Sequence, residues 1–112
     1  MNPTTIIQKQ VEAYNQRDID AFVACHHRQV ELYNFSEAQP FATGREKVRE
    51  IYGDVFEHSP NLHTEVMQRI IIGNRVIDYE TVRGRKGIEE MLFVAIYEVE
   101  DELIRKAHFI RG

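Results

Sequence analysis

The spacing of apolar residues predicts that the chain begins with two helices. Ile7, Val11 and Tyr14 recur at intervals of three and four residues, so they share one face of a helix that should end near residue 16. Asp18 is of a type that caps helix N-termini, and a short second helix should follow it. The residues that share a face of this second helix are Ile19, Phe22, Val23 and His26.

A third helix is predicted in the middle of the chain. Thr43 and Glu46 have the spacing of a capping box, in which each side chain bonds the backbone of the other residue. Ser59-Pro60 should end the helix, because proline disfavours helical geometry at the residue before it. The apolar stripe between these signals consists of Val48, Ile51, Tyr52, Val55 and Phe56.

The remaining segments have the pattern of strands. Gln29–Phe35 predicts a strand, and Pro40–Thr43 predicts a short edge strand. Gly73-Asn74 is a two-residue loop of the kind that joins hairpin strands. The second half of the chain then predicts four strands, which are His63–Ile72, Arg75–Val82, Ile88–Val99 and Leu103–Arg111.

The order of these elements predicts the fold class. Helices come first and a run of strands comes last, which favours an α+β domain with helices on the concave face of a curved sheet. The sequence has no internal repeat and no linker rich in Pro, Gly or Ser, so we expect one domain, residues 1–112.

Composition excludes several classes of partner. The formal charge of −4 and the lack of a long basic cluster argue against nucleic acid. No apolar run approaches the ~20 residues of a membrane span, and the first residues do not resemble a signal peptide.

Cys25 is the only cysteine, so it is expected to be a buried thiol in a cytoplasmic protein. The adjacent His26 and His27 lack the spacing of metal ligands, so neither a metal nor a cofactor is expected.

Four short motifs resemble the nuclear transport factor 2-like superfamily, which includes ketosteroid isomerases and SnoaL-type polyketide cyclases. The resemblance extends from Pro3 to Ile110 and implies a cystatin-like α+β roll: a cone-shaped, curved antiparallel sheet with three helices from the N-terminal half on its concave face. It also implies a pocket for a small apolar molecule. The motifs are Asp18–Phe22, Thr43–Glu46, Gly73–Val76 and Tyr79–Gly84.

The resemblance does not extend to the chemistry of ketosteroid isomerases. Asn34 stands where those enzymes carry their aspartate base, and an amide cannot accept and return a proton. Gln10 and Ala95 stand in the positions of the two oxyanion donors. Steroid isomerisation by the usual residues is therefore not expected.

Two positions, Glu80 and His108, are candidates for other acid–base chemistry. Asp78 and Glu80 share one strand face, and the resemblance implies that this face points into the cavity, where a desolvated Glu80 carboxyl would have a raised pKa. The opposite register would place both carboxylates in water. His108 on the last strand is a second candidate acid or base, and the alternative is a packing role.

Aromatic side chains and a few polar groups are expected to line the pocket or to fill the core. The expected ligand-binding residues are Tyr14, Phe22, Asn34, Tyr52, Phe56, Asp78, Phe93 and Tyr97. The strand Ile88–Val99 is apolar on both faces, which predicts a homodimer through the uncovered face of the sheet.

Three functional hypotheses remain open from the sequence. The first is an isomerase- or lyase-type enzyme that uses acid–base chemistry in an apolar pocket. The second is a ligand carrier without catalysis. The third is a scaffold whose pocket is filled by its own side chains and whose sheet serves dimerisation.

Overall fold

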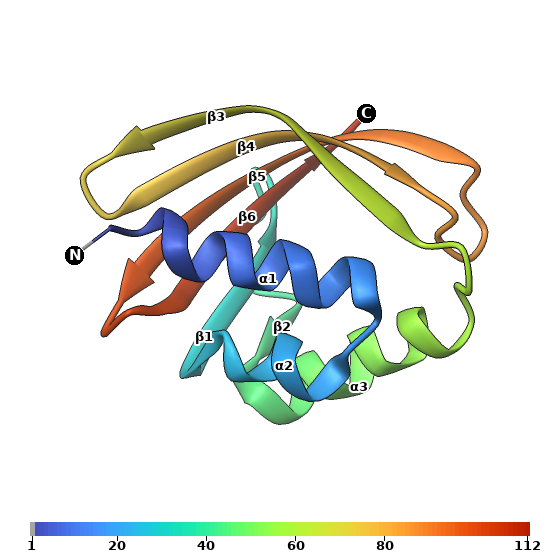
Figure 1. The fold of residues 1–112 in the computed structure, drawn as a ribbon. Coiled ribbons are helices and arrows are strands. Elements are labelled where there is room, and N and C mark those ends of the chain that lie inside the picture. The colour runs from blue at the N-terminus through green and yellow to red at the C-terminus, as the bar shows by residue number, and fades with distance from the viewer. Residues whose placement is uncertain (1) are drawn as a thin grey trace.

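Six strands form one curved, open sheet, and three helices lie on its hollow side (Figure 1). The computed structural model describes residues 2–112, so Met1, which the expected domain includes, lies outside the described residues. The order of elements confirms the predicted α+β class. The elements are α1 (Thr4–Gln16), α2 (Ile19–Ala24), β1 (His26–Asn34), β2 (Ala42–Thr43), α3 (Gly44–Glu57), β3 (His63–Ile72), β4 (Arg75–Arg83), β5 (Glu90–Glu100) and β6 (Leu103–Arg111).

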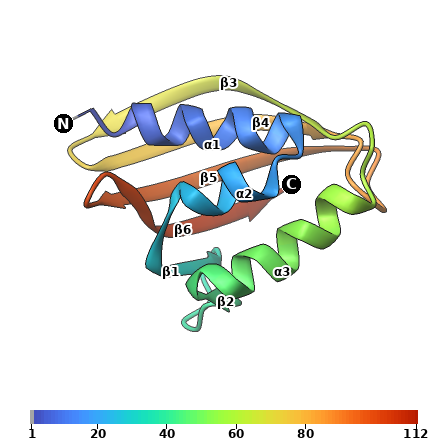
Figure 2. The same cartoon turned by 60° about the horizontal axis from the view of Figure 1, so that its bottom comes forward.

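One strand pairing differs from the wholly antiparallel sheet that we expected. The order across the sheet is β2-β1-β6-β5-β4-β3, and β3 to β6 form the predicted antiparallel meander. β1 pairs with β6 in parallel. The two strands are not joined by a hairpin, because the chain passes through α3 and four other strands between them (Figure 2), and such crossovers permit parallel pairing.

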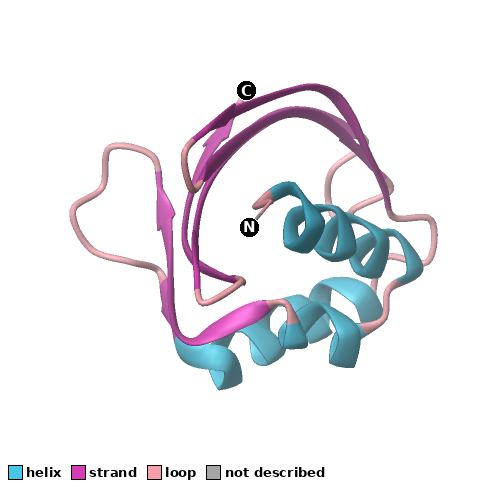
Figure 3. Cartoon of the chain, turned by 60° about the vertical axis from the view of Figure 1, so that its left-hand side comes forward, coloured by secondary structure: helices cyan, strands magenta, loops and turns pink. Residues whose placement is uncertain are grey.

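The helices close the concave side of the sheet. Figure 3 shows the long strands bending around α1, with the other helices along the open side. α1 contacts β3 and β6, and α3 contacts β1. Strand alternation buries every second residue of β5 on this side. These inward residues are Met91, Phe93, Ala95, Tyr97 and Val99. Among residues 2–112, no helix has the length and apolar character needed to cross a membrane.

Two local predictions are wrong. The first strand begins at His26 rather than at Gln29, and Phe35 lies beyond its end with 53% of its surface exposed. Thr43 is the N-cap residue of α3, but its side chain makes no capping hydrogen bond, so the predicted capping box does not form. Asp18 does cap α2 as predicted, since its side chain accepts a hydrogen bond from the Ala21 N–H at 3.1 Å.

The convex face of the sheet is apolar and uncovered in the single chain. In the strand register Val94 lies opposite Tyr79 of β4 and Ile110 of β6, and Ile96 lies opposite Ile77, so apolar residues of three strands adjoin on this face. Among them, Leu92 is 48% exposed, well above the level of a core leucine. The exposed residues of this convex patch include Ile70, Tyr79, Leu92 and Ile110.

The β4–β5 loop packs tightly against the segment that follows α3. Gly84 has φ of +72° and approaches Asn61 so closely that a Cβ would lie 2.1 Å from the Asn61 carbonyl oxygen. The Lys86 N–H donates to Ser59 Oγ at 2.9 Å, which fixes the loop at a second point. Gly87 has a similar φ of +79°, but a Cβ there would meet no atom within 4 Å.

This contrast predicts unequal effects of two matched substitutions. Gly87→Ala should cost about 1 kcal/mol, the usual strain of a left-handed alanine. Gly84→Ala adds a steric clash to the same strain, so it should cost roughly 2–4 kcal/mol. Urea unfolding of both variants measures the difference, and equal losses of unfolding free energy would contradict the close packing at Asn61.

Candidate functional site

A small hollow lies inside the cone, between the helices and the concave face of the sheet. Its volume is about 30 Å³, which is room for roughly one water molecule. Aromatic rings make up much of its wall, and one ionisable carboxyl group faces it. The lining residues are Gln10, Val11, Tyr14, Phe22, His26, Tyr52, Thr64, Glu80, Val82, Arg85, Phe93, Tyr97 and Phe109.

Glu80 is the carboxyl group of the hollow. It lies on β4 opposite Phe93, on the inward face, and only 4% of its surface is exposed. Its Oε1 lies 2.7 Å from the hydroxyl of Thr64. Its Oε2 is buried and has no hydrogen-bond partner among residues 2–112. One oxygen of the carboxyl group is therefore held in place and the other is available to a bound molecule.

The Thr64 hydroxyl is shared between two acceptor oxygens. It donates to Glu80 Oε1 at 2.7 Å and lies 3.0 Å from the Thr81 carbonyl oxygen. A hydroxyl has one hydrogen, so it cannot donate fully to both oxygens. The hydrogen bond to Glu80 stabilises the ionised carboxyl group, so it lowers the pKa of Glu80.

Burial of Glu80 acts in the opposite direction and has the larger effect on its pKa. Burial raises the pKa of Glu80 to about 7, against a lowering by the Thr64 hydrogen bond. The neighbouring carboxylate of Asp78 raises this pKa further, and the more distant guanidinium of Arg69 lowers it. A carboxyl group with this pKa exchanges a proton near neutral pH, which is the property of a general acid or base.

Asp78 shares the inward face but has a different role from the one expected. It is fully buried, and both of its oxygens accept from Arg69, at 2.6 Å and 2.9 Å. The pair is bidentate, a geometry that fixes both side chains. Asp78 therefore does not line the hollow. Its negative charge is paired with the guanidinium of Arg69, which makes no hydrogen bond to Glu80.

Thr64 and its support could not be found from the sequence. The Asn15 side chain accepts from the Thr64 N–H at 2.7 Å and donates to the Thr64 carbonyl at 3.0 Å. These reciprocal bonds attach the end of α1 to the start of β3 and set the position of the hydroxyl next to Glu80. Neither residue carries a motif, and the contact joins distant parts of the chain.

Three tyrosines surround the carboxyl group as neutral hydrogen-bond donors. Burial raises the pKa of Tyr14 to about 12, and it raises the pKa of Tyr52 and of Tyr97 as well. The Tyr97 hydroxyl donates to Gln10 Oε1 at 3.3 Å. Phenols that stay protonated can donate to an oxygen that gains negative charge during proton transfer.

His26 is a second buried ionisable group that faces the hollow. Burial lowers its pKa to about 4, partly offset by the hydrogen bond to the Phe22 carbonyl. The Nδ1–Phe22 O distance is 2.8 Å, so Nδ1 carries the proton of the neutral ring. The sequence placed His26 on an apolar face but did not select it as a site residue.

Most of the aromatic residues expected at the pocket do line the hollow. Those that do are Tyr14, Phe22, Tyr52, Phe93 and Tyr97. Phe56 lies behind this wall, with its ring 5.6 Å from the ring of Tyr14. Asn34 lies at the end of β1 outside the lining, where its Oδ1 accepts from Arg111.

His108 is on the opposite face of the sheet from the hollow. It pairs with Ile96 in the β5–β6 register, whereas the neighbouring Ala107 and Phe109 point inward. Its ring stacks on Tyr33, with centroids 4.5 Å apart and planes at 8°. His108 therefore does not face the hollow, because strand alternation gives the inward positions to the residues on either side of it.

The acidic turn after β5 brings a histidine near two carboxylates. His27 Nε2 lies 3.7 Å from Glu100 Oε2 and 3.4 Å from Asp101 Oδ2. The Gln29 N–H donates to His27 Nδ1 at 3.0 Å, so the hydrogen of the neutral ring is on Nε2. This tautomer has no lone pair on Nε2 to offer a metal, and the N–H points toward the carboxylates instead.

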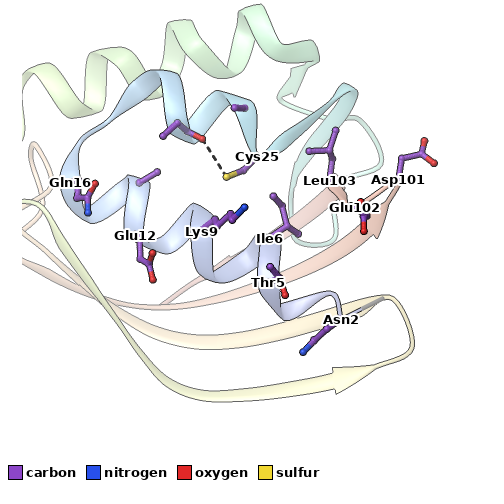
Figure 4. A pocket seen from close by; sticks show the side chains of 13 residues that line it. Asn2, Thr5, Ile6, Lys9, Glu12, Gln16, Cys25, Asp101, Glu102 and Leu103 are labelled. Carbon is purple, nitrogen blue, oxygen red and sulfur yellow. Dashed lines mark hydrogen bonds between the residues drawn. The ribbon is translucent and has the colours of Figure 1, made fainter.

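A larger groove of about 860 Å³ lies outside the cone, between α1, α2 and the β5–β6 turn (Figure 4). Lys9, Glu12 and the acidic turn line it with exposed charged groups. Its buried polar group is the Cys25 thiol, which donates to the Ala21 carbonyl at 3.3 Å. Burial raises the pKa of this thiol, so it is not an activated nucleophile. The smaller hollow, with its unsatisfied carboxyl oxygen, is the better candidate site.

The comparisons with known proteins agree with this fold. A family model described as the SnoaL-like domain matches residues 7–107. An uncharacterized cystatin-fold protein from Novosphingobium aromaticivorans is 23% identical, with 99% of each chain covered and a TM-score of 0.90. No curated protein matches the chain.

Two further solved structures are similar at lower identity. A hypothetical protein from Catenulispora acidiphila with a ketosteroid isomerase-like fold, in complex with trimethylamine, is 15% identical, with 94% of this chain and 83% of that chain covered and a TM-score of 0.79. AclR from Streptomyces galilaeus, described as a putative hydroxylase, is 13% identical, with 98% and 78% covered and a TM-score of 0.82. Similarity at this level shows the fold alone.

The two buried ionisable groups predict opposite effects of pH on stability. Between pH 4.5 and about 7 the unfolded chain loses the Glu80 proton first, so rising pH should remove about 3 kcal/mol of unfolding free energy. Between pH 6.5 and about 4 the unfolded chain gains the His26 proton first, so falling pH should remove about as much. The two dependences overlap and largely cancel in the native protein.

Single substitutions should separate these two effects. In Glu80→Gln, unfolding free energy should rise steeply from pH 4 to 6.5, and in His26→Gln it should fall from pH 4.5 to 7. Urea unfolding at several pH values measures both curves, with the exposed Glu12→Gln as a control for loss of a surface charge. Curves parallel to that of the native protein would contradict the assigned protonation states.

Proposed function

This chain belongs to the SnoaL-like domain family, and from that premise we propose that it binds a small, largely apolar molecule in the hollow and moves a proton on it. Glu80 is the proposed acid and base, and the reaction is of isomerase or lyase type. The observation that carries the proposal is the buried Glu80 Oε2, which has no partner among residues 2–112 and faces an aromatic cavity. Cofactors are not part of this proposal.

The proposed step needs only groups that the chain supplies. The Glu80 carboxylate takes a proton from a carbon next to a carbonyl group, and the bonding electrons move to the carbonyl oxygen to form an enolate. A neutral tyrosine hydroxyl donates a hydrogen bond to that oxygen. Glu80 then returns the proton to the same or another carbon. Tyr14 and Tyr52 are the available donors, because the Tyr97 hydroxyl already donates to Gln10 Oε1.

Deuterium exchange into a small enone tests this step without knowledge of the natural substrate. With 2-cyclopentenone in D₂O, the native protein should catalyse exchange at the acidic C–H positions, with a rate that rises with pH around a midpoint of about 7. Glu80→Gln should lower the catalysed rate at least about 100-fold. Proton NMR measures the loss of signal.

Two variants control this experiment. Thr64→Val keeps the carboxyl group but removes the hydrogen bond that lowers its pKa, so the midpoint of the pH profile should move upward. Glu98→Gln removes a partly exposed carboxylate that pairs with Arg75, and it should leave the rate unchanged. Exchange that survives in Glu80→Gln would refute the assigned base.

The small volume of the hollow favours a second candidate function. A space of about 30 Å³ admits a bound molecule only if side chains such as Tyr14 or Arg85 move aside. If they do not move, the chain is a non-catalytic domain whose pocket is filled by its own residues. The exchange experiment separates these candidates, because a filled core would not accelerate exchange with or without Glu80.

We also propose a homodimer through the convex patch. Leu92 and Ile110 are exposed there and lie on neighbouring strands of the same face. A second copy related by a twofold axis would cover each patch with its own equivalent.

The buried, unpaired thiol of Cys25 supports a reducing compartment, and we propose the cytoplasm.

Replacement of two apolar residues by charges tests the dimer. The native protein should sediment as a dimer at micromolar concentration, and Leu92→Glu with Ile110→Lys should sediment as a folded monomer. Ile71→Glu is a matched control, because Ile71 is as exposed as Leu92 but faces the other side of the sheet. A monomeric native protein in analytical ultracentrifugation would refute this interface.

A further inference from the structure

Two guanidinium groups lie where the hollow meets solvent. Among the described residues that line it, every one is buried except Arg85, which is half-buried and so marks the open side. Arg111 is exposed and lies over two lining rings, with Cζ 5.6 Å from the centroid of Phe93 and 5.8 Å from that of Phe109. Both guanidiniums act electrostatically on the hydroxyl of Tyr52, so they belong to the same region.

Neither group is neutralised by the protein. Within residues 2–112, no carboxylate oxygen lies within 4.0 Å of Arg85 or Arg111, although Arg49, Arg69 and Arg75 each have such a partner. The carboxyl group that faces the hollow is Glu80, and below neutral pH it is mostly protonated and uncharged, so it does not neutralise the two guanidinium groups. Two unpaired cations beside an apolar cavity create a positive potential at its entrance.

Both side chains are also held in place. Asn34 Oδ1 accepts from Arg111 Nη1, and the two aromatic rings support the guanidinium plane from one side. Arg85 is next to Gly84, which packs on the Asn61 backbone, and its charge lowers the pKa of Tyr14 against the effect of burial. Asn34 thus acts on the site through Arg111 rather than by lining the pocket.

We propose that the molecule bound in the hollow carries a carboxylate, which Arg85 and Arg111 hold at the entrance while the apolar part lies among the rings. This inference rests on the proposed function and names its substrate class. A guanidinium presents paired N–H donors that match the two oxygens of a carboxylate, so geometry and charge both favour this group. The reacting carbon would then lie inward, toward Glu80.

Crotonate and its neutral isostere crotonamide are suitable probes, since they are thin and differ chiefly in charge. NMR titration should show tighter binding of crotonate, by about tenfold or more, with shifts at Thr64 and Tyr52. Arg85→Gln and Arg111→Gln should each weaken crotonate about tenfold and leave crotonamide within about twofold. Arg111→Lys should recover only part of the affinity, because the paired donors are lost.

Arg75→Gln is the matched control, because it removes the same charge from the far end of β4, where Arg75 pairs with Glu98. It should leave the affinity for both probes unchanged. Binding of crotonamide as tight as that of crotonate would overturn the carboxylate inference while the proposed function stands. If neither probe shifts the Thr64 and Tyr52 signals up to its solubility limit, the pocket does not bind such molecules and both proposals fail.

Discussion

The inward face of β4 imposes the constraint on which the site depends. Strand alternation places two carboxyl groups, Asp78 and Glu80, side by side inside an apolar cone. Arg69 reaches only the first of them and neutralises it completely. Glu80 is left with a hydroxyl partner, and a carboxyl group without a cation in such a place keeps its proton more strongly. The chemistry that we assign to the hollow follows from this unequal supply of positive charge.

The aromatic rings around Glu80 exclude water, and the charged side chains of Arg85 and Arg111 lie farther from Glu80, toward solvent. This arrangement separates two tasks that a small binding site must combine. The inner part can exchange a proton in a medium of low polarity, and the entrance can attract and orient a charged molecule. Residues from α1, β3, β4 and β5 meet at the inner part, so its geometry depends on the whole cone rather than on one loop.

Periodicity predicted the helices and the hairpins, because these depend on the spacing of neighbouring residues. The inward facing of Glu80 was implied by the family resemblance, since strand alternation alone left both registers open. The parallel β1–β6 pairing was not predicted, since it depends on how distant segments meet. The same limit explains the site. Thr64 and Asn15 have no distinctive pattern, and Arg85 and Arg111 look like ordinary surface cations. The face that His108 occupies could not be predicted either, because a one-residue difference in register, which sequence cannot fix, reverses the face of a side chain.

The parallel pairing also bears on how the molecule forms. β1 finds its long-range neighbour only in β6, the last strand of the chain, although β2 pairs with it locally. During synthesis the three helices and the first strand therefore emerge well before the surface that will complete them. Contacts of such large sequence separation slow folding, because the intervening chain must be ordered before the contact is made. The interior of the cone is complete only when β6 has paired with β1 and β5, because β6 supplies Phe109 to the wall of the hollow.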